Sequence, residues 1–550
     1  MNEESAGRAR RRRLLILAIC CLSLFIVGLD NTVVNTALPS IQHDLNAPAS
    51  GLQWVIDAYT LVLAALLMLS GSVADRIGRR RVFLTGLLVF ALGSLLCSLA
   101  PGLGWLVGFR ALQAVGGSML NPVAMSIITN TFTDRRERAQ AIGVWGGVVG
   151  ISMALGPLVG GFLVDSYGWP SIFLINVPVG LAAFALTLRY VPESRAPRAR
   201  RLDPVGQVLM LVLLGCGTAA IIEGPSHGWT SPLILGLATV AVLALVALPL
   251  WERRVAEPLI DPRFFRSVPF AGATVTAVCA FAALGGFLFL NALYLQDVRG
   301  YSPVEAGLWT LPMALAMLVF APLSGRIVGR QGPRLPLVGA GVALAASGLL
   351  LTRLTAGTPG WLLLAAYLLF GIGFGLVNAP ITNSAVSGMP LAQAGVAAAV
   401  ASTSRQVGQS LGVAVIGTAV TAAVVGPFAA GFPAASHVGW WIVTGLGLTV
   451  LALGLVTTTP WAARTAARTA ELLDPARPGV PGSPPSGYDD HYGGRAGRAV
   501  ATGLHEARRG TSGLHRAGWW VTPTRGDPRD SATENRPPAA SAAGKGETVV

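Results

Sequence analysis

Fourteen apolar segments, each long enough to cross a lipid bilayer, follow one another through the first 460 residues of the chain. A helix needs about 20 mostly apolar residues to cross the hydrocarbon core. The segments form a group of six, a middle pair and a second group of six: Leu14–Val34, Trp54–Ala74, Val82–Ala100, Trp105–Thr129, Ala141–Val164, Ser171–Val191; Pro204–Ile222, Pro232–Leu250; Pro269–Leu295, Ala306–Val328, Leu335–Leu351, Trp361–Ser384, Gly395–Val420, Val438–Thr459. This pattern predicts an all-α integral membrane protein with 14 transmembrane helices.

The charge content supports that fold class. Charged residues are only 12% of the chain, about half the share that a soluble protein needs to cover its surface. We therefore divide the chain into a basic cytoplasmic N-terminus, a six-helix bundle, two inserted helices, a second six-helix bundle and a tail: 1–13, 14–191, 204–250, 269–459 and 460–550. The tail is rich in Pro, Gly, Ala, Ser and Arg without periodicity, so we expect it to be disordered and cytoplasmic.

The arginines predict the orientation in a cell membrane. Before the first span, in the even-numbered gaps and in the span ends that adjoin these gaps the chain has 24 arginines, against two, Arg299 and Arg353, in the odd-numbered gaps. Cytoplasmic loops retain Arg and Lys, so both termini are expected in the cytoplasm. The regular recurrence of the clusters also excludes nucleic acid as a partner, because nucleic-acid binders gather basic residues on one face.

The basic start of the chain has a second interpretation. Arg10–Arg13 followed by an apolar run could be a signal peptide, but no small-residue cleavage site follows. We interpret the run as an uncleaved first span.

A short sequence occurs twice at equivalent places. Leu69–Arg80 and Leu323–Arg334 share Leu, Ser, Gly, Arg, Gly and Arg at identical spacing, each after the second span of a group of six. The chain is therefore expected to consist of two pseudo-repeated halves, an architecture in which transporters bind substrate where the halves meet. The alternative is a generic helix end in an Arg-rich protein, which six matches at equivalent positions make weaker.

Several motifs resemble those of one family. Gly71–Arg81 looks like the signature loop of the major facilitator superfamily (MFS), and Leu29–Pro39 resembles the first-helix motif of its fourteen-spanning drug:proton antiporters, which are multidrug efflux transporters. Gly156–Gly161 matches the antiporter motif of the fifth helix, and Arg405–Gly412 resembles a thirteenth-helix pattern. The resemblance covers Leu14–Thr459. It implies that the first-helix Asp is needed for transport and that the fourth-helix Arg takes part in proton transfer.

The energy source follows from what the sequence lacks. The one lysine, Lys545, lies outside any phosphate-binding motif, so no ATP site is expected. No metal-ligand cluster, cofactor motif or nucleophile constellation stands out, which argues against an enzyme or a sensor anchored by its helices. An ion gradient remains, and a proton crossing the membrane gains about 2.3 kcal/mol per 100 mV.

Charged residues inside spans are costly and usually functional. Asp30 in the first span and Arg110 in the fourth lie at similar depth in the outer half, so we predict that this pair couples protons to transport. The alternative is a permanent ion pair that only holds two helices together. Asp57 is a third candidate, and for it an equally good alternative is an interfacial carboxylate touching headgroups or external water.

Two motifs are candidates for conformational roles. In the signature loop, Asp75 can pair with nearby Arg and with a helix N-terminus, which would hold the cytoplasmic side shut; the repeat has Gly329 at this place. The predicted gating residues are Gly71, Asp75, Arg76, Gly78, Arg79 and Arg80. The alternative for the arginines is a purely topogenic role.

The antiporter motif, Gly156, Pro157, Gly160 and Gly161, predicts a helix that approaches its neighbours closely and can flex at Pro157. The alternative is passive packing of glycines.

The C-terminal half has no intramembrane acid, whereas Arg405 offers a donor for an anionic or carbonyl group. We take Asn31, Asn35, Arg405 and Gln406 as candidates for the substrate cavity. The expected partners are a small lipophilic molecule, neutral or of mixed charge, together with protons and the lipid bilayer, and we expect a monomer. The sequence thus predicts export of lipophilic drugs in exchange for protons by alternating access. A proton-coupled importer and an exporter of an endogenous metabolite or lipid stay open as alternatives.

Overall fold

The structure is a computed structural model that describes residues 3–195, 203–255, 257–387, 389–390 and 393–473. All helices of this part of the chain lie within one compact unit, Met1–Tyr492. The helices of the N-terminal half are α1 (Glu3–Leu45), α2 (Ala49–Ile77), α3 (Arg79–Ser98), α4 (Leu103–Ser118), α5 (Asn121–Thr131), α6 (Arg135–Tyr167), α7 (Ser171–Leu174) and α8 (Asn176–Tyr190).

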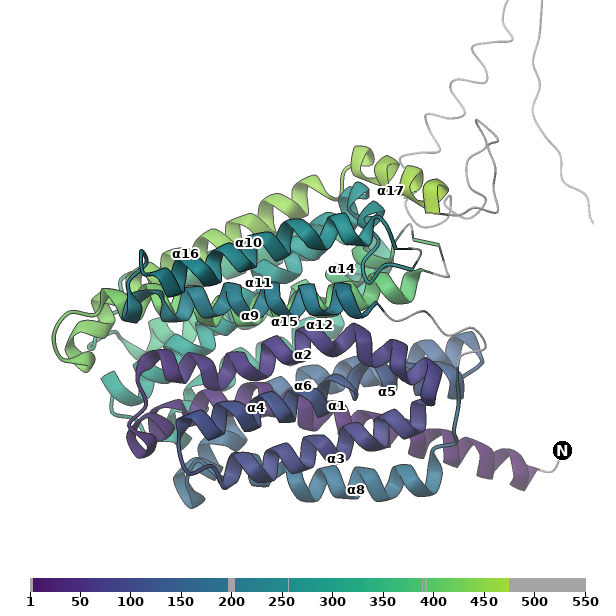
Figure 1. Ribbon diagram of the computed structural model, residues 1–550, viewed down its shortest axis with the longest axis horizontal. Helices are drawn as coiled ribbons and strands as arrows, with labels where there is room; N and C mark the ends of the chain where they lie inside the picture. The colour runs from purple at the N-terminus through teal and green to yellow at the C-terminus, as the bar shows by residue number, and fades with distance from the viewer. Residues whose placement is uncertain (1–2, 196–202, 256, 388, 391–392, 474–550) are drawn as a thin grey trace, which may run out of the picture. The chain divides into compact units, whose positions relative to one another are not determined.

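The inserted pair and the C-terminal half follow. The inserted helices are α9 (Pro204–His227) and α10 (Pro232–Glu252). The C-terminal half consists of η1 (Pro262–Arg266), α11 (Val268–Leu293), η2 (Tyr294–Val298), α12 (Pro303–Gln331), α13 (Arg334–Leu351), α14 (Gly360–Val386), α15 (Ala394–Ala423), α16 (Phe428–Val456) and α17 (Pro460–Leu473). Figure 1 shows the N-terminal half below the inserted pair and the C-terminal half.

The predicted all-α membrane fold is confirmed. Thirteen helical spans in the described part of the chain are long and apolar enough to cross a membrane. The predicted fifth span, Ala141–Val164, lies inside the 33-residue helix α6, which is not among these thirteen. The predicted number of fourteen is therefore not confirmed exactly.

The fourth span is broken into two helices. α4 ends at Ser118 and α5 begins at Asn121, with Pro122 in its first turn. Proline has no N–H to donate to the preceding turn, so the break coincides with Pro122. The continuous helix expected for Trp105–Thr129 is thus interrupted near its middle.

The helix contacts repeat between the halves. In the N-terminal half α1 packs against α6 and α8, α2 against α4, and α3 against α4 and α8. In the C-terminal half α11 packs against α15 and α16, α12 against α14, and α13 against α14 and α16. Each of these contacts of one half therefore has its counterpart in the other.

The duplicated sequence makes equivalent contacts in both halves. Ser70, on α2, shares a hydrogen bond of 2.9 Å with Ser118 of α4. Ser324, on α12, donates a bond of 2.6 Å to the carbonyl oxygen of Leu376 on α14. In each copy the serine joins the second helix of a half to the fourth, so the repeat is also a repeat of packing.

The two largest interfaces between the halves are those of α6 with α12 and of α2 with α15. Each of these two interfaces is the counterpart of the other when one half is matched to the other, because α6 corresponds to α15 and α12 to α2. The inserted helix α9 packs against α2 and α15 and so lies beside the second interface. α10 packs on α9 and leaves apolar side chains such as Leu243 and Val246 exposed, as expected for a helix that faces lipid.

The predicted disorder of the tail is wrong for its first residues, because helix α17 begins at Pro460. Ala462, Ala466 and Leu473 are buried on one side of α17, which packs against α11 and η1. The Thr465 hydroxyl accepts a 3.0 Å hydrogen bond from the first backbone N–H of α11 at Val268. Alanine is the strongest helix former, and its density here outweighs the polar composition. Residues 474–550 of the predicted tail lie outside the described residues.

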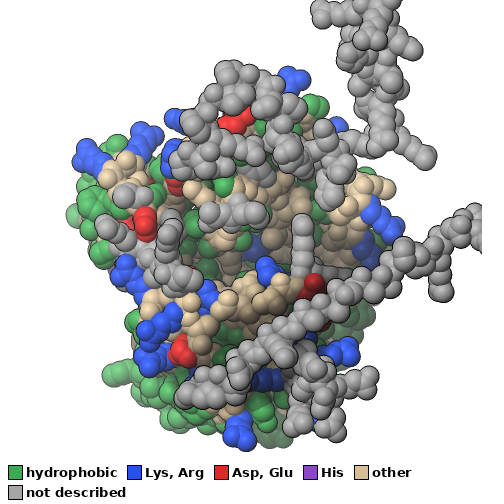
Figure 2. Space-filling view, turned by 90° about the vertical axis from the view of Figure 1, so that its right-hand side faces the viewer, with side chains coloured by type: hydrophobic (Ala, Val, Ile, Leu, Met, Phe, Trp, Pro, Cys, Tyr) green, Lys and Arg blue, Asp and Glu red, His purple; other side chains and the backbone are tan. Residues whose placement is uncertain are grey.

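The two ends of the bundle differ in charge. One end carries Arg79–Arg81 and Arg330 and is called the Arg-rich end below; Figure 2 looks onto it and shows basic side chains around its rim. The opposite end carries the turns between α1 and α2 and between α15 and α16, and is called the far end.

Candidate functional site

Asp30 and Arg110 meet in the interior of the N-terminal half. Arg110 Nη1, on α4, donates to Asp30 Oδ2, on α1, at 2.6 Å, and the side chains are 1% and 0% exposed. The sequence predicted that the two lie at similar depth, and the structure places them in direct contact. An acid and a base that are both withdrawn from water therefore form the charged centre of this half.

Neutral amides complete the surroundings of Asp30. Its Oδ1 accepts hydrogen bonds from Gln113 Nε2 at 2.9 Å and from Asn176 Nδ2 at 3.0 Å. Both amides also donate to Ser94 Oγ, at 2.6 and 3.3 Å. Asp30 therefore accepts from three donors on α4 and α8, with Ser94 of α3 behind them. A buried carboxylate needs such partners to be stable.

Arg110 is held just as fully. Nη1 also donates to Gln113 Oε1 at 2.7 Å, and Nε donates to the backbone carbonyl oxygen of Val55 on α2 at 3.1 Å. The guanidinium carbon lies 4.2 Å from the centre of the Tyr59 ring, within range of a cation–π contact. Helices α1, α2, α3, α4 and α8 thus converge on one ion pair.

The sequence prediction missed Gln113, Asn176, Ser94 and Tyr59. Neutral polar side chains are frequent in membrane spans and do not stand out there as a charge does. One signal was available, because Gln113 follows Arg110 by three residues and so shares its helix face.

Asp57 is buried, which contradicts the alternative of a carboxylate touching headgroups or external water. Its side chain is 0% exposed. Oδ1 accepts a 3.3 Å bond from Thr60 Oγ1 on the same helix, whereas Oδ2 has no hydrogen-bond partner within the described residues. Ser410, on α15, is its neighbour across the interface between the halves. Asp57 does not join the Asp30–Arg110 pair.

The signature loop makes its contacts inside the N-terminal half. Asp75 Oδ1 accepts from Arg79 Nη2 at 2.9 Å, and Glu193, which the sequence prediction missed, accepts from the backbone N–H of Arg80 at 3.1 Å. Gly78 adopts φ +131°, and a side chain there would strike Glu193. Arg80 Nη2 donates to the carbonyl oxygen of Leu188 at 2.6 Å.

The two other predicted loop residues lie beside this arrangement. Gly71 lies against Pro122 of α5, and the Arg76 side chain is exposed. The hydrogen-bond partners of Asp75, Arg79 and Arg80 thus lie in the loop itself, in α8 and in the residues directly after α8. A clasp from Asp75 to the other half stays a prediction.

The antiporter motif lies between the two halves. A side chain at Gly156 would overlap Thr32, and one at Gly160 would overlap Thr36, so both glycines let α6 approach α1. On its other side, Gly161 lies against the backbone of Pro303, and Gly307 lies against the carbonyl oxygen of Pro157. The motif therefore brings α6 into backbone contact with α1 and α12.

The four predicted cavity residues fall into two pairs. On α1, Asn35 Nδ2 donates to the carbonyl oxygen of Asn31 at 3.3 Å, and both Oδ1 atoms lack partners within the described residues. On α15, Arg405 donates to Thr382 Oγ1 of α14, while its Nε and the Oε1 of Gln406 lack partners within that same part. No hydrogen bond or ion pair between described residues joins the two pairs. Unsatisfied groups of this kind are available to a ligand.

Among the residues that the structure describes, two side-chain hydrogen bonds join the halves, both near the far end. Thr418 Oγ1, on α15, donates to Gln53 Oε1 of α2 at 3.2 Å, and Gln296 Nε2 of η2 donates to the carbonyl oxygen of Thr36 on α1 at 2.9 Å. A methyl group at Gly417 would lie 2.6 Å from Gln53 Nε2. The halves are therefore in close contact at the far end.

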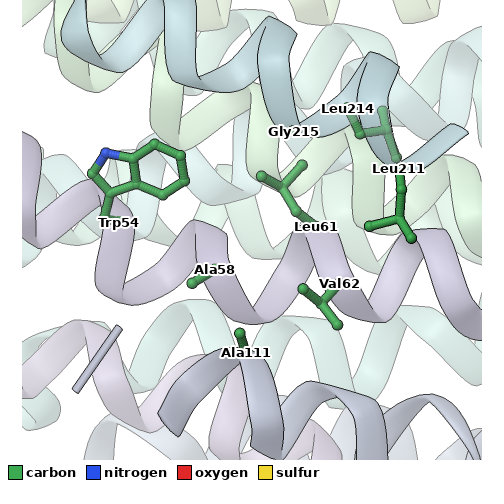
Figure 3. Close-up of a pocket in the computed structure, with 8 residues that line it drawn as sticks. All are labelled: Trp54, Ala58, Leu61, Val62, Ala111, Leu211, Leu214 and Gly215. Atoms are coloured by element: carbon green, nitrogen blue, oxygen red, sulfur yellow. The ribbon is translucent and has the colours of Figure 1, made fainter. Parts of the chain in front are cut away.

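One apolar pocket lies outside the polar cluster. It has a volume of about 210 Å³ between α2, α4 and the inserted helix α9, and Figure 3 shows its lining side chains: Trp54, Ala58, Leu61, Val62, Ala111, Leu211, Leu214 and Gly215. The Trp54 indole donates to Glu223 Oε1 of α9 at 2.8 Å, which ties the inserted helix to α2. Within the described residues, no cluster of three or more His, Cys, Asp or Glu side chains could hold a metal ion.

Comparison with known proteins agrees with this architecture. Residues 20–413 match the family described as the Major Facilitator Superfamily. The chain is similar to a solved structure described as a POT family transporter in complex with 5-aminolevulinic acid, with a TM-score of 0.59 at 15% sequence identity, over 80% of this chain and 94% of that one. At this identity the likeness concerns the fold.

Curated relatives are more similar in sequence. The chain is 38% identical over 412 residues to the multidrug resistance protein Stp of Mycobacterium tuberculosis (strain CDC 1551 / Oshkosh), covering 75% of this chain and 76% of that protein. It is 39% identical over 421 residues to the tetracenomycin C resistance and export protein of Streptomyces glaucescens, covering 76% of this chain and 78% of that protein. One relative is thus described as a multidrug resistance protein and the other as a resistance and export protein.

Proposed function

Because the chain belongs to the major facilitator superfamily, we propose that it is a secondary active transporter that exports lipophilic drugs in exchange for protons by alternating access. Its relatives are multidrug and antibiotic resistance efflux proteins. Export of this kind places the protein in the cell membrane, and we propose that the Arg-rich end faces the cytoplasm together with both termini.

The observation that carries the proton coupling is the buried pair of Asp30 and Arg110. Five helices converge on this pair. Buried ion pairs stabilise a fold no better than apolar packing does, so we infer that the pair serves through its charge state rather than through stability. Protonation of Asp30 removes the charge that holds Arg110 Nη1, Gln113 Nε2 and Asn176 Nδ2 in place. The packing of α1 against α4 and α8 then changes, and a proton is thereby linked to the conformation of the half.

The two interfaces between the halves support alternating access. Because α6–α12 and α2–α15 correspond to each other under the repeat, one half can rock against the other about both interfaces. The glycines of α6 have no side chains that would project toward α1 and α12, so these helices can lie close together and slide. The contacts near the far end then describe one of the two states, closed to that side.

The unpartnered donors and acceptors support a mixed-character substrate. Arg405 Nε, and the side-chain oxygens of Asn31, Asn35 and Gln406, can hydrogen-bond to carbonyl, hydroxyl or anionic groups. We propose a substrate that is lipophilic, neutral or of mixed charge, and bound by a monomer.

A susceptibility panel tests this proposal. An efflux-deficient bacterial host expresses the wild type, Asp30→Asn, or the matched control Asp165→Asn, which alters an exposed acid on α6 near the far end. We expect the wild type and the control to raise tolerance to several lipophilic antibiotics, and Asp30→Asn to behave as the empty host. A protonophore should abolish the difference in drug accumulation.

Two outcomes contradict drug export. Greater drug accumulation on expression of the wild type would indicate an importer. Unchanged tolerance to every compound, with the protein present in the membrane, would favour an exporter of an endogenous metabolite or lipid.

A further inference from the structure

Asp57 lies in the interface that closes the far end, one helical turn along α2 from Gln53. Gln53 is bonded to Thr418 of α15, and Thr418 Oγ1 also lies 3.4 Å from the carbonyl oxygen of Ile221 on α9. Asp57 is turned to the same helix, α15, where Ser410 is its neighbour. The carboxyl group is therefore enclosed by the contact that separates the far side from the interior.

The enclosure offers little to a negative charge. Oδ1 accepts one long bond from Thr60, the nearby Ser410 hydroxyl of α15 adds a further weak donor, and Oδ2 has no hydrogen-bond partner of normal geometry within the described residues. Asp30, by comparison, accepts three bonds, one of them from a guanidinium. A buried carboxylate without a cation or several donors is strongly disfavoured against its neutral form. The closed interface fits Asp57 as a neutral acid.

No charged group among the described residues of the surrounding helices compensates Asp57. Arg110 of α4 is engaged by Asp30 of α1 and by the Val55 carbonyl oxygen. Glu223 of α9 is engaged by Trp54 and lies 3.5 Å from His227. The titratable Tyr59, two residues along α2, lies against the Arg110 guanidinium.

α15 itself brings no acid to the level of Ser410. Its Arg405 lies five residues closer to the Arg-rich end and bonds Thr382. Asp57 is thus a solitary titratable group among neutral residues in an interface that must open and close.

We propose that Asp57 is the proton switch of the far-end gate: the contact of α2 with α15 closes when Asp57 is protonated and parts when Asp57 ionises. The proton is taken from water on the far side when the gate is open and returns to that water when it opens again. Asp57 then acts as a positioning residue for the conformational cycle. Its proton is not carried across the membrane.

This role rests on the proposed transport cycle and gives Asp30 and Asp57 different functions in it. Asp30, in the centre of the N-terminal half, couples the transported proton, whereas Asp57 makes closure of the far side depend on the pH of that side. An acidic far side stabilises the closed gate and thereby resets the transporter after substrate has left. A neutral residue at position 57 would remove this dependence.

The test measures the gate directly. Spin labels at His43→Cys and Val425→Cys, both exposed near the far end on opposite halves, report the distance across it in the full chain in lipid nanodiscs. The five native cysteines are replaced first. We expect the open population of the wild type to grow several-fold between pH 5 and pH 9. Asp57→Asn should stay closed throughout, while the control Asp165→Asn keeps the shift.

The result that overturns the switch is a pH-dependent opening in Asp57→Asn equal to that of the wild type, or no opening in the wild type over this range. Asp57→Ser, a smaller neutral replacement, should behave as Asp57→Asn and guards against a folding defect of either variant. The distances need no transported substrate. Loss of the shift in both variants therefore supports the switch even if the wild type fails to export drugs, and that failure would count against the proposed function alone.

Discussion

At the scale of single residues, the interior of the N-terminal half is organised by charge. Asp30 and Arg110 stand out in the sequence because each interrupts a long apolar run, where an unpaired charge is costly. The structure explains how the cost is offset: both carboxylate oxygens of Asp30, and Nε and Nη1 of Arg110, have a partner on a neighbouring helix. The partners themselves could not be predicted, since which amides reach Asp30 depends on how helices far apart in sequence are rotated.

Replacing Arg110 by Lys tests whether the planar guanidinium is needed. Arg110 serves Asp30 and Gln113 through Nη1 and Val55 through Nε, whereas Lys offers a single ammonium group. We expect Arg110→Lys to lower the transport rate at least tenfold while the protein stays folded. Arg110→Ala leaves Asp30 without its cation and should cost about 3–5 kcal/mol of stability.

Thermal unfolding in detergent and transport in vesicles measure the two effects. Arg353→Lys, at an exposed arginine, is the matched control and should change neither. Wild-type transport in Arg110→Lys would show that any cation at this position is sufficient.

At the scale of secondary-structure elements, hydropathy predicts most helices but not their interruptions. The apolar runs mark the spans, because only helices satisfy their backbone hydrogen bonds within the membrane. Hydropathy does not predict the break between α4 and α5, which lies next to Pro122 in the first turn of α5. It also misses α17, whose polar composition conceals an alanine face that packs on α11.

The close approach of α6 to α1 gives a prediction at this scale. Gly156→Val places two methyl groups where Thr32 lies, and overpacking of this kind costs about 1–3 kcal/mol. We expect a lower melting temperature and loss of transport.

The matched control is Gly147→Val on the same helix, where a side chain meets open space. It should retain the melting temperature and most of the transport. Equal behaviour of the two variants would show that the α1–α6 contact is not needed for transport.

At the scale of the whole molecule, the repeat of packing is the main result. The sequence showed the duplication in twelve residues, and the structure extends it to the helix contacts of both halves. The distribution of arginines predicted which helix ends lie on the same side of the membrane. In the structure, Arg79–Arg81 and Arg330 lie at one end of the bundle, where Figure 2 shows basic side chains. Distances between the two halves could not be predicted, because they depend on the state of the transport cycle.

Thiol labelling checks the orientation. With the native cysteines replaced, Val425→Cys at the far end should react with a membrane-impermeant maleimide in intact cells. Arg330→Cys at the Arg-rich end should react only in everted vesicles. The reverse pattern would contradict cytoplasmic termini.

The most direct test of the central claim is proton movement evoked by substrate in everted membrane vesicles with an established proton gradient. A compound to which the wild type confers tolerance is added, and the luminal pH is followed with a fluorescent dye. We predict that the wild type and Asp165→Asn release protons from the lumen on addition of the compound, and that Asp30→Asn does not. Proton release by Asp30→Asn at the wild-type rate, or none by the wild type, would contradict the account.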